Sequence, residues 1–134
     1  MTYRINLKPQ EPELDGSDLL DLINAWLEDL ATRLPAATVD GYAIKLQYFV
    51  QWWGTFGAVK HWKVSRQTLA QFNRWLTDSA RTKRGEALSY HTRNDVLRRM
   101  KQLFRWAKAT DRIPVDLTDW IPAVEGSAPL RVAP

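Results

Sequence analysis

Apolar residues recur every three to four positions along four stretches of the chain, the spacing that places them on one face of an α-helix. In the first stretch, residues 17–34, the period is carried by Leu19, Ile23, Trp26, Leu27, Leu30 and Leu34. Ser17 is the expected N-cap, because its hydroxyl can accept a hydrogen bond from the first turn, and Asp18 and Asp21 follow it. Pro35 is the expected stop. These features predict a first helix that buries one face.

Two further helices are predicted in the middle of the chain. The second covers residues 37–54, with a core face made by Val39, Ala43, Leu46, Phe49, Val50 and Trp53. "GTFGAVKHWKV" has no helical period and is predicted to be a loop. The third helix covers residues 66–80, is capped by Ser65, and buries Leu69, Phe72 and Leu76 with Trp75 at the margin. The polar, glycine-containing "RTKRGEAL" predicts another loop.

The fourth helix is predicted to begin at Leu88 or Ser89 and to end near Thr110–Arg112, before Pro114. Its apolar face is made by Val96, Leu97, Met100, Leu103, Phe104 and Ala107. Met100 and Trp106 are therefore explained by packing and require no cofactor. "LTDWIP" is predicted to form one short turn.

The number and type of these elements predict the fold class. No stretch alternates apolar and polar residues over a useful length, and no internal repeat is present. We therefore predict a compact all-α bundle of four main helices without a sheet, covering residues 17–122. Residues 1–16 are expected to form an extended leader. Residues 123–134 are expected to be a linker toward a further domain.

Composition agrees with one globular domain and narrows its environment. The chain has 134 residues, is 45% hydrophobic and contains seven Trp, which argues for a real core and against disorder. It contains no cysteine, which excludes disulfides and thiolate chemistry and favours a reducing, cytoplasmic location. No apolar run approaches the ~20 residues that span a bilayer, and the N-terminus lacks the apolar stretch of a signal peptide.

Charge is sorted along the chain. Residues 1–40 hold three basic and eight acidic side chains, whereas residues 65–112 hold twelve basic and four acidic ones. A concentrated basic region most often faces a polyanion, although a solvated basic face that serves solubility would look the same in sequence.

Candidate catalytic and metal-binding chemistry is sparse. The two histidines, His61 and His91, have no partner at metal-ligand spacing, and no serine lies in a G-x-S-x-G context. The first helix carries Asp18, Asp21, Glu28 and Asp29, which a solvated face explains. We therefore expect no metal, no cofactor and no catalysis by this chain alone.

The basic surface is the remaining candidate site. On the fourth helix one polar stripe is formed by Asn94, Arg98, Lys101, Arg105 and Lys108, flanked by Arg93. Its first turn offers Ser89, Tyr90, His91 and Thr92, and the preceding loop adds Arg81, Lys83 and Arg84. Hydroxyls and backbone N–H groups hold phosphates, and Arg or Asn can reach base edges.

The same basic helix is compatible with two other kinds of partner. Basic amphipathic helices also dock on membranes and on proteins. Membrane insertion would have nothing left to bury, because the apolar face is used by the core. An all-α protein-interaction module whose basic face meets an acidic partner remains the second hypothesis.

The order of these segments resembles the N-terminal, SAM-like core-binding domain of tyrosine recombinases, the phage integrase family. The resemblance covers residues 17–122 and is carried by "LINAWLEDL", "TVDGYAIKLQYFVQWW", "VSRQTLAQFNRWL" and "LSYHTRNDVLRRMKQLFRWAKATDRIPVD". Thr38 and Tyr42 match a Thr-x-x-x-Tyr start of the second helix. Ser89 and Thr92 match a Ser-x-x-Thr start of the fourth, and "FRWA" matches its aromatic end.

The resemblance implies a domain that clamps one face of a DNA duplex through its second and fourth helices. The matching contact residues on the second helix are Thr38, Tyr42 and Lys45. Those on the fourth are Ser89, Tyr90, His91, Arg93, Asn94 and Arg98. Two residues that match the family pattern have a structural alternative. Tyr42 would pack against the core, and Thr92 would cap or buttress its helix.

The chain departs from the family in its catalytic elements. The family uses an Arg, a His-x-x-Arg element and a nucleophilic Tyr, all in a C-terminal domain, and "HTRN" at His91 is not that element because Asn94 stands in the Arg position. The resemblance thus implies a non-catalytic part of a recombinase. Its expected partners are double-stranded DNA and other recombinase protomers on DNA, and the isolated domain is expected to be monomeric.

Overall fold

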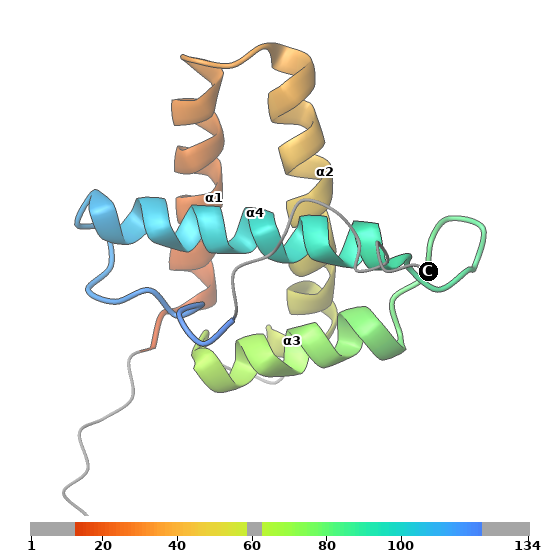
Figure 1. Cartoon of the computed structure of the whole chain (residues 1–134). Coiled ribbons are helices and arrows are strands. Elements are labelled where there is room, and N and C mark those ends of the chain that lie inside the picture. The colour runs from red at the N-terminus through yellow and green to blue at the C-terminus, as the bar shows by residue number, and fades with distance from the viewer. Residues whose placement is uncertain (1–12, 59–62, 122–134) are drawn as a thin grey trace, which may run out of the picture.

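The computed structural model describes residues 13–58 and 63–121, and in these ranges the chain is a bundle of four helices without a sheet. The helices are α1 (Gly16–Ala31), α2 (Ala36–Trp52), α3 (Arg66–Asp78) and α4 (Tyr90–Ala109). Figure 1 shows α1 and α2 as an antiparallel pair, α4 crossing in front of both, and α3 below α4. The predicted all-α bundle is confirmed. The expected linker at 123–134 and residues 1–12 of the expected leader lie outside the described residues.

The start of α1 differs from the prediction. Ser17 is not the N-cap, because the helix already begins at Gly16 and Asp15 occupies the cap position. The carboxylate of Asp15 pairs with Lys63 rather than with the helix. Leu14 and Val64 exchange two backbone hydrogen bonds of 2.8 and 2.7 Å, which hold the segment before α1 in place. The helix start is therefore set by this pairing and not by the serine hydroxyl.

The end of α2 also differs from the prediction. Residues 54–57, which were expected to be a loop, continue the helix as a π-helical turn, η1 (Trp53–Gly57). Trp53 O accepts from Ala58 N at 2.8 Å, a bond that spans five residues. The turn buries both Trp52 and Trp53, whereas Val39 and Val50, expected on the core face, are only partly buried. The buried face of α2 is thus centred on its aromatic residues.

Two glycines, Gly16 at the start of α1 and Gly57 at the end of η1, explain how Trp53 fits. A Cβ atom at Gly16 or at Gly57 would overlap the Trp53 indole. The indole therefore lies directly against the backbone at the start of α1 and at the end of η1. Glycine is the residue type that permits this approach, because it has no side chain.

The core is aromatic where the helices meet. Phe49 of α2 and Phe72 of α3 make an edge-to-face contact with ring centroids 5.1 Å apart, and Trp52 lies 5.4 Å from Phe72. The α4 face is buried as predicted at Val96, Met100, Leu103, Phe104 and Ala107. Burial of each large apolar side chain contributes about 1.5–3 kcal/mol, so this junction accounts for much of the driving force for folding.

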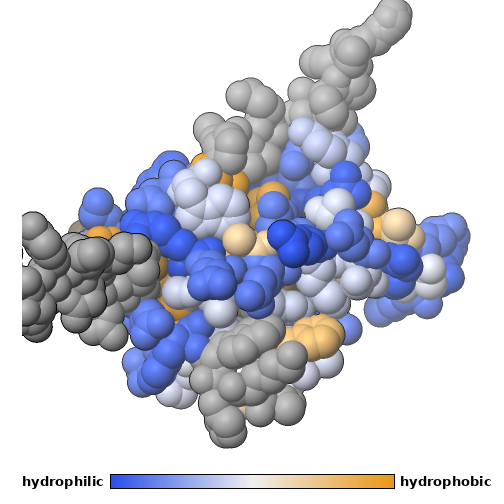
Figure 2. Space-filling view, turned by 90° about the horizontal axis from the view of Figure 1, so that it is seen from below, coloured by the Kyte–Doolittle hydropathy of each residue, from blue (hydrophilic) through white to orange (hydrophobic). Residues whose placement is uncertain are grey.

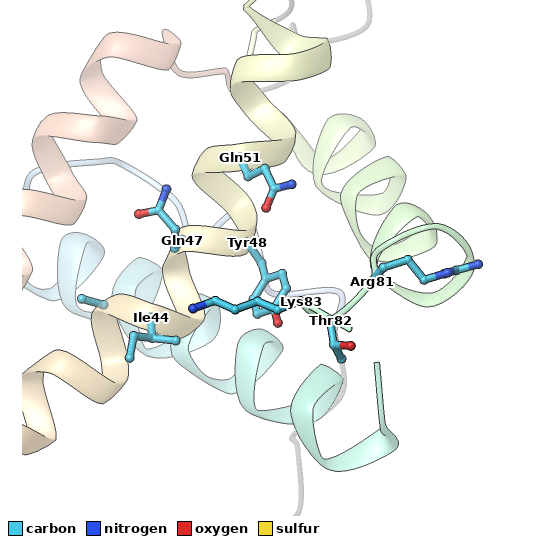
Figure 3. Close-up of a pocket in the computed structure, with 8 residues that line it drawn as sticks. Ile44, Gln47, Tyr48, Gln51, Arg81, Thr82 and Lys83 are labelled. Carbon is cyan, nitrogen blue, oxygen red and sulfur yellow. The ribbon is translucent and has the colours of Figure 1, made fainter. Parts of the chain in front are cut away.

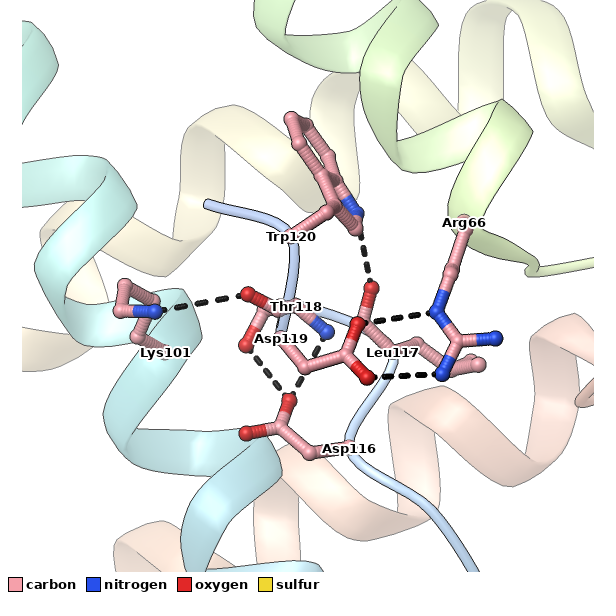
Figure 4. A network of polar contacts seen from close by, with 7 residues as sticks. All are labelled: Arg66, Lys101, Asp116, Leu117, Thr118, Asp119 and Trp120. Atoms are coloured by element: carbon pink, nitrogen blue, oxygen red, sulfur yellow. Dashed lines mark hydrogen bonds and ion pairs between the residues drawn. The ribbon is translucent and has the colours of Figure 1, made fainter. Parts of the chain in front are cut away.

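Residues 113–121, called here the C-terminal turn, pack against α3 and α4 through a polar network (Figure 4). Lys101 of α4 donates to the carbonyl oxygen of Ile121 at 2.6 Å. Arg66 of α3 binds Asp119 through two hydrogen bonds of 2.9 and 2.8 Å. Thr118 is fully buried and donates its N–H and hydroxyl to Asp116. The short turn predicted for "LTDWIP" is confirmed for residues 117–121.

Candidate nucleic-acid interface

Residues 81–87, called here the basic hairpin, form an ordered turn rather than an irregular loop. Arg81 and Ala87 make an antiparallel bridge, and Thr82 N donates to Glu86 O at 2.8 Å. The Thr82 hydroxyl accepts from the N–H groups of Arg84 and Glu86, both at 3.2 Å. Gly85 has a φ of 82°, which glycine adopts without strain. The hairpin thereby projects Lys83 and Arg84 into solvent on a fixed backbone.

The first turn of α4 follows directly, and Ser89, one of the two predicted starting residues, is its N-cap. Ser89 accepts from Thr92 N at 3.1 Å and donates to the Thr92 hydroxyl at 3.1 Å. Tyr90 and His91 are exposed. The first N–H groups of a helix have no intrahelical partner and carry a partial positive charge, so they favour an anion. The start of α4 therefore combines a phosphate-binding backbone with exposed polar side chains.

Two cations on α4 are engaged by neighbouring groups. Arg93 donates to Leu88 O at 3.1 Å and lies 5.9 Å from the centroid of the Tyr90 ring. Arg98 pairs with Asp95 at 2.7 Å. Both guanidinium groups are partly buried, so their orientation is fixed before any ligand arrives.

Arg84 and Arg105 are different, because they are exposed and their side chains make no hydrogen bond or ion pair within residues 13–58 and 63–121. Arg105 shares one side of α4 with Asn94 and Arg98, at a spacing of i, i+4 and i+11. These two residues contribute positive charge that no described carboxylate neutralises.

Lys101 lies on the same side of α4, four residues before Arg105, but it is engaged by the C-terminal turn. Its ammonium group donates to the carbonyl oxygens of Ile121 at 2.6 Å and of Thr118 at 3.4 Å. Lys101 thus holds the C-terminal turn, and a DNA contact by Lys101 would require these carbonyls to be exchanged for phosphate. The stripe expected from the sequence is divided between a structural cation and solvent-facing ones.

The predicted contact residues on α2 are less uniform. Thr38 is exposed and Lys45 is half-buried, and neither has a side-chain partner among the described residues. Tyr42 packs against the core, stacked on Trp26 with ring centroids 5.7 Å apart. The Arg99 guanidinium lies 4.1 Å from the centroid of the Tyr42 ring. The packing alternative for Tyr42 therefore describes its position, as the buttressing alternative does for Thr92.

Arg99 was not singled out from the sequence. It links α4 to α2 through Tyr42 and also donates to Gln102 at 2.7 Å. A cation that falls between the apolar and polar faces of a helix gives no periodic signal. Only the position of α2 beside α4 shows its role.

A groove between α2 and the basic hairpin was also not expected. It has a volume of about 630 Å³ and is lined by Ala43, Ile44, Gln47, Tyr48, Gln51, Arg81, Thr82 and Lys83. Figure 3 shows Lys83 extending from the hairpin across Tyr48 toward Ile44. Ile44 is 62% exposed. The available sequence signal was the outward spacing of Ile44, Gln47 and Gln51 at i, i+3 and i+7.

The two shifted pKa values belong to ion pairs outside the basic hairpin and the start of α4. The hydrogen bond from Arg66 holds the pKa of Asp119 below its usual range. The hydrogen bond and charge of Asp15 raise the pKa of Lys63. Both pairs lie at the surface and join segments that are distant in sequence.

Metal-binding and membrane-spanning features were sought in the described parts of the chain. Figure 2 shows the face seen from below as mostly hydrophilic, with hydrophobic residues in small separate areas. Across the described ranges no group of three or more His, Asp or Glu side chains could hold a metal ion. The helices of these ranges are also too short or too polar to cross a membrane. Comparison with protein-family models, curated proteins and solved structures found no match for this chain.

Proposed function

We propose that this chain is a non-catalytic DNA-binding domain that clamps a duplex through α4, the basic hairpin and the N-terminal half of α2, as the core-binding domains of tyrosine recombinases do. The observation that carries the proposal is a pair of exposed side chains without an ion pair in the described ranges: Arg84 in the hairpin, next to the capped start of α4, and Arg105 further along the same helix. In this role the protein would act on DNA in the cytoplasm, together with further recombinase protomers.

The electrostatic layout supports this partner. The acidic side chains of α1 belong to a different element from the basic hairpin. The cations near α1, Arg33 and Lys63, are ion-paired. Phosphate contacts use cations and backbone N–H donors. The exposed cations are Lys83 and Arg84 of the hairpin, and the first turn of α4 supplies helix N–H groups. Asn94 and His91 lie next to them and supply groups that can reach base edges.

The proposal is tested by fluorescence anisotropy of a labelled duplex over a series of salt concentrations. With about five phosphates engaged, log affinity should fall with log salt at a slope of roughly −4 to −5, from a Kd in the ~10⁻⁴ to 10⁻⁶ M range. The double variant Arg84→Ala/Arg105→Ala should make this slope shallower by about 2, because each phosphate contributes about 0.9.

The matched control is Arg33→Ala/Lys63→Ala, which removes the same charge from two ion-paired positions. Its salt slope should equal that of the wild type. Equal losses in both double variants would mean that only net charge matters. A wild type that does not bind duplex DNA at low salt would contradict the proposal.

A further inference from the structure

The groove beside the basic hairpin has the features of a docking surface. Its α2 wall exposes Ile44, an aliphatic side chain surrounded by polar residues, and the hairpin wall brings Lys83 close to it (Figure 3). Lys83 has no ion pair within the described parts of the chain. Arg81 donates only to the carbonyl oxygens of Ala80 and Asp78, so its charge is not balanced by a carboxylate. A complementary surface would present an apolar side chain next to carboxylates.

Such a surface exists on α1 of the same chain. Leu20 is 37% exposed and, with Ile44, is one of the two aliphatic residues among the exposed large hydrophobic side chains of the described ranges. Asp21 and Glu28 lie on the same side of α1 and have no ion pair in those ranges. Asn24 lies between them. At 3.6 residues per turn, Leu20 and Asn24 lie next to this acidic side of α1, and the two carboxylates are on one flank of the leucine.

We propose that the groove binds the outward face of α1 from a second copy of this chain. Leu20 of one copy would pack on Ile44 and Tyr48 of the other, and Asp21 and Glu28 would lie on the side of Lys83, the cation that extends toward Ile44. The two carboxylates are about 10 Å apart along the helix, since each residue rises about 1.5 Å, and Ile44 and Gln51 span the same length of α2. One helix can therefore lie along the α2 wall of the groove.

The proposed contact is heterologous, because the groove and the α1 face share no residue. Each copy keeps one unused groove and one unused α1 face, so association continues beyond a dimer. A single helix in a shallow groove is in the size class of transient interfaces, below about 1,200 Å². The dilute protein is then monomeric, and association depends on a high protein concentration. The contact itself does not depend on DNA.

The test uses sedimentation velocity of the full chain at low salt over a concentration series. The wild type should show a weight-average mass that rises past that of a dimer. Ile44→Glu should block the groove, and Leu20→Lys should block the α1 face. Each should lower the association constant by about tenfold or more, the equivalent of roughly 1.4 kcal/mol at an interface anchor. Both positions are exposed, and circular dichroism checks that the helices are retained.

The decisive arm mixes the two variants. Ile44→Glu keeps a working α1 face and Leu20→Lys keeps a working groove, so the mixture should form 1:1 heterodimers and nothing larger. A mixture that stays monomeric, or a wild type that is monomeric throughout, would overturn the inference. If Ile44→Glu instead lowers DNA affinity while the wild type never associates, the groove belongs to DNA. DNA binding without association refutes the inference alone, so its failure differs from failure of the proposed function.

Discussion

The basic hairpin and the C-terminal turn both pack near α4 and both involve cations, but they use them differently. At the C-terminal turn Lys101 and Arg66 are bound to a backbone carbonyl and a carboxylate, respectively, and hold the segment on the bundle. At the hairpin the same structural task is done by the Thr82 hydroxyl and by Gly85. The cations there are left in solvent. At the hairpin, Thr82 and Gly85 stabilise the turn, so Lys83 and Arg84 are not needed for it and remain available for binding.

The largest expected effect is the loss of the clamp at the C-terminal turn. Lys101→Met should lower the free energy of unfolding by about 1–3 kcal/mol, because it leaves the carbonyl oxygen of Ile121 without its donor. Urea unfolding at neutral pH measures this loss. A change within about 0.5 kcal/mol, typical of an ordinary surface position, would remove the contrast between the two regions.

The second effect concerns the N-cap of α4, which follows the basic hairpin. Ser89→Ala should cost about 1 kcal/mol, because the hydroxyl that caps α4 is lost. Ser17→Ala is the matched control: Ser17 lies inside α1 and makes no side-chain hydrogen bond in the described ranges, so stability should be unchanged or slightly raised. Thermal and urea unfolding of both variants should differ in this direction. Equal losses would mean that Ser17 caps α1 after all.

The third effect is a pH dependence at the C-terminal turn. The pKa of Asp119 is lowered by Arg66, so the ionised carboxylate stabilises the folded state above the unfolded pKa of about 3.9. This contribution is lost as pH falls through the lower pKa of the folded state. Because the carboxylate is half-exposed, Asp119→Asn should cost only about 0.2–1 kcal/mol at pH 7.

The difference in stability between Asp119→Asn and the wild type should shrink toward zero as the pH falls through the lowered pKa of Asp119, since the carboxyl group is then neutral, as the amide is. Urea unfolding at the two pH values measures it. A difference that stays constant with pH would show that the amide disturbs packing rather than the ion pair.

The smallest effect on stability is expected at the free cations. Arg84→Ala/Arg105→Ala should change the free energy of unfolding by less than about 0.5 kcal/mol, since neither side chain has a partner in the described ranges. The measurement is urea unfolding of the same protein used for the DNA titrations. A larger loss would mean that these arginines support the fold, as Lys101 does.

Much of the fold could be predicted from the sequence, because apolar residues at helical spacing and small polar caps act locally. The cap at Ser65 and the buried face of α4 were found in this way. Ser17 was misassigned because the start of α1 depends on the pairing of Leu14 with Val64, which is distant in sequence. Residues 54–57 were misassigned because burial of Trp53 overrides two glycines.

The candidate site was less predictable for the same reason. The spacing of residues on α4 shows which cations share one side of the helix, but it does not show which of them another segment occupies. Lys101 is occupied by carbonyls 17 and 20 residues further along the chain. The groove at Ile44 required knowledge of where the hairpin lies. Contacts across the sequence decide which charges are available.

The Trp53 indole restricts what can change at two distant sites at once. Any side chain at residue 16 or 57 would have to displace the ring, which would also disturb its stacking on Phe49. The start of α1 and the end of η1 therefore depend on the same side chain, the Trp53 indole. Loosening either one should appear as a red shift in tryptophan emission before the helices themselves melt.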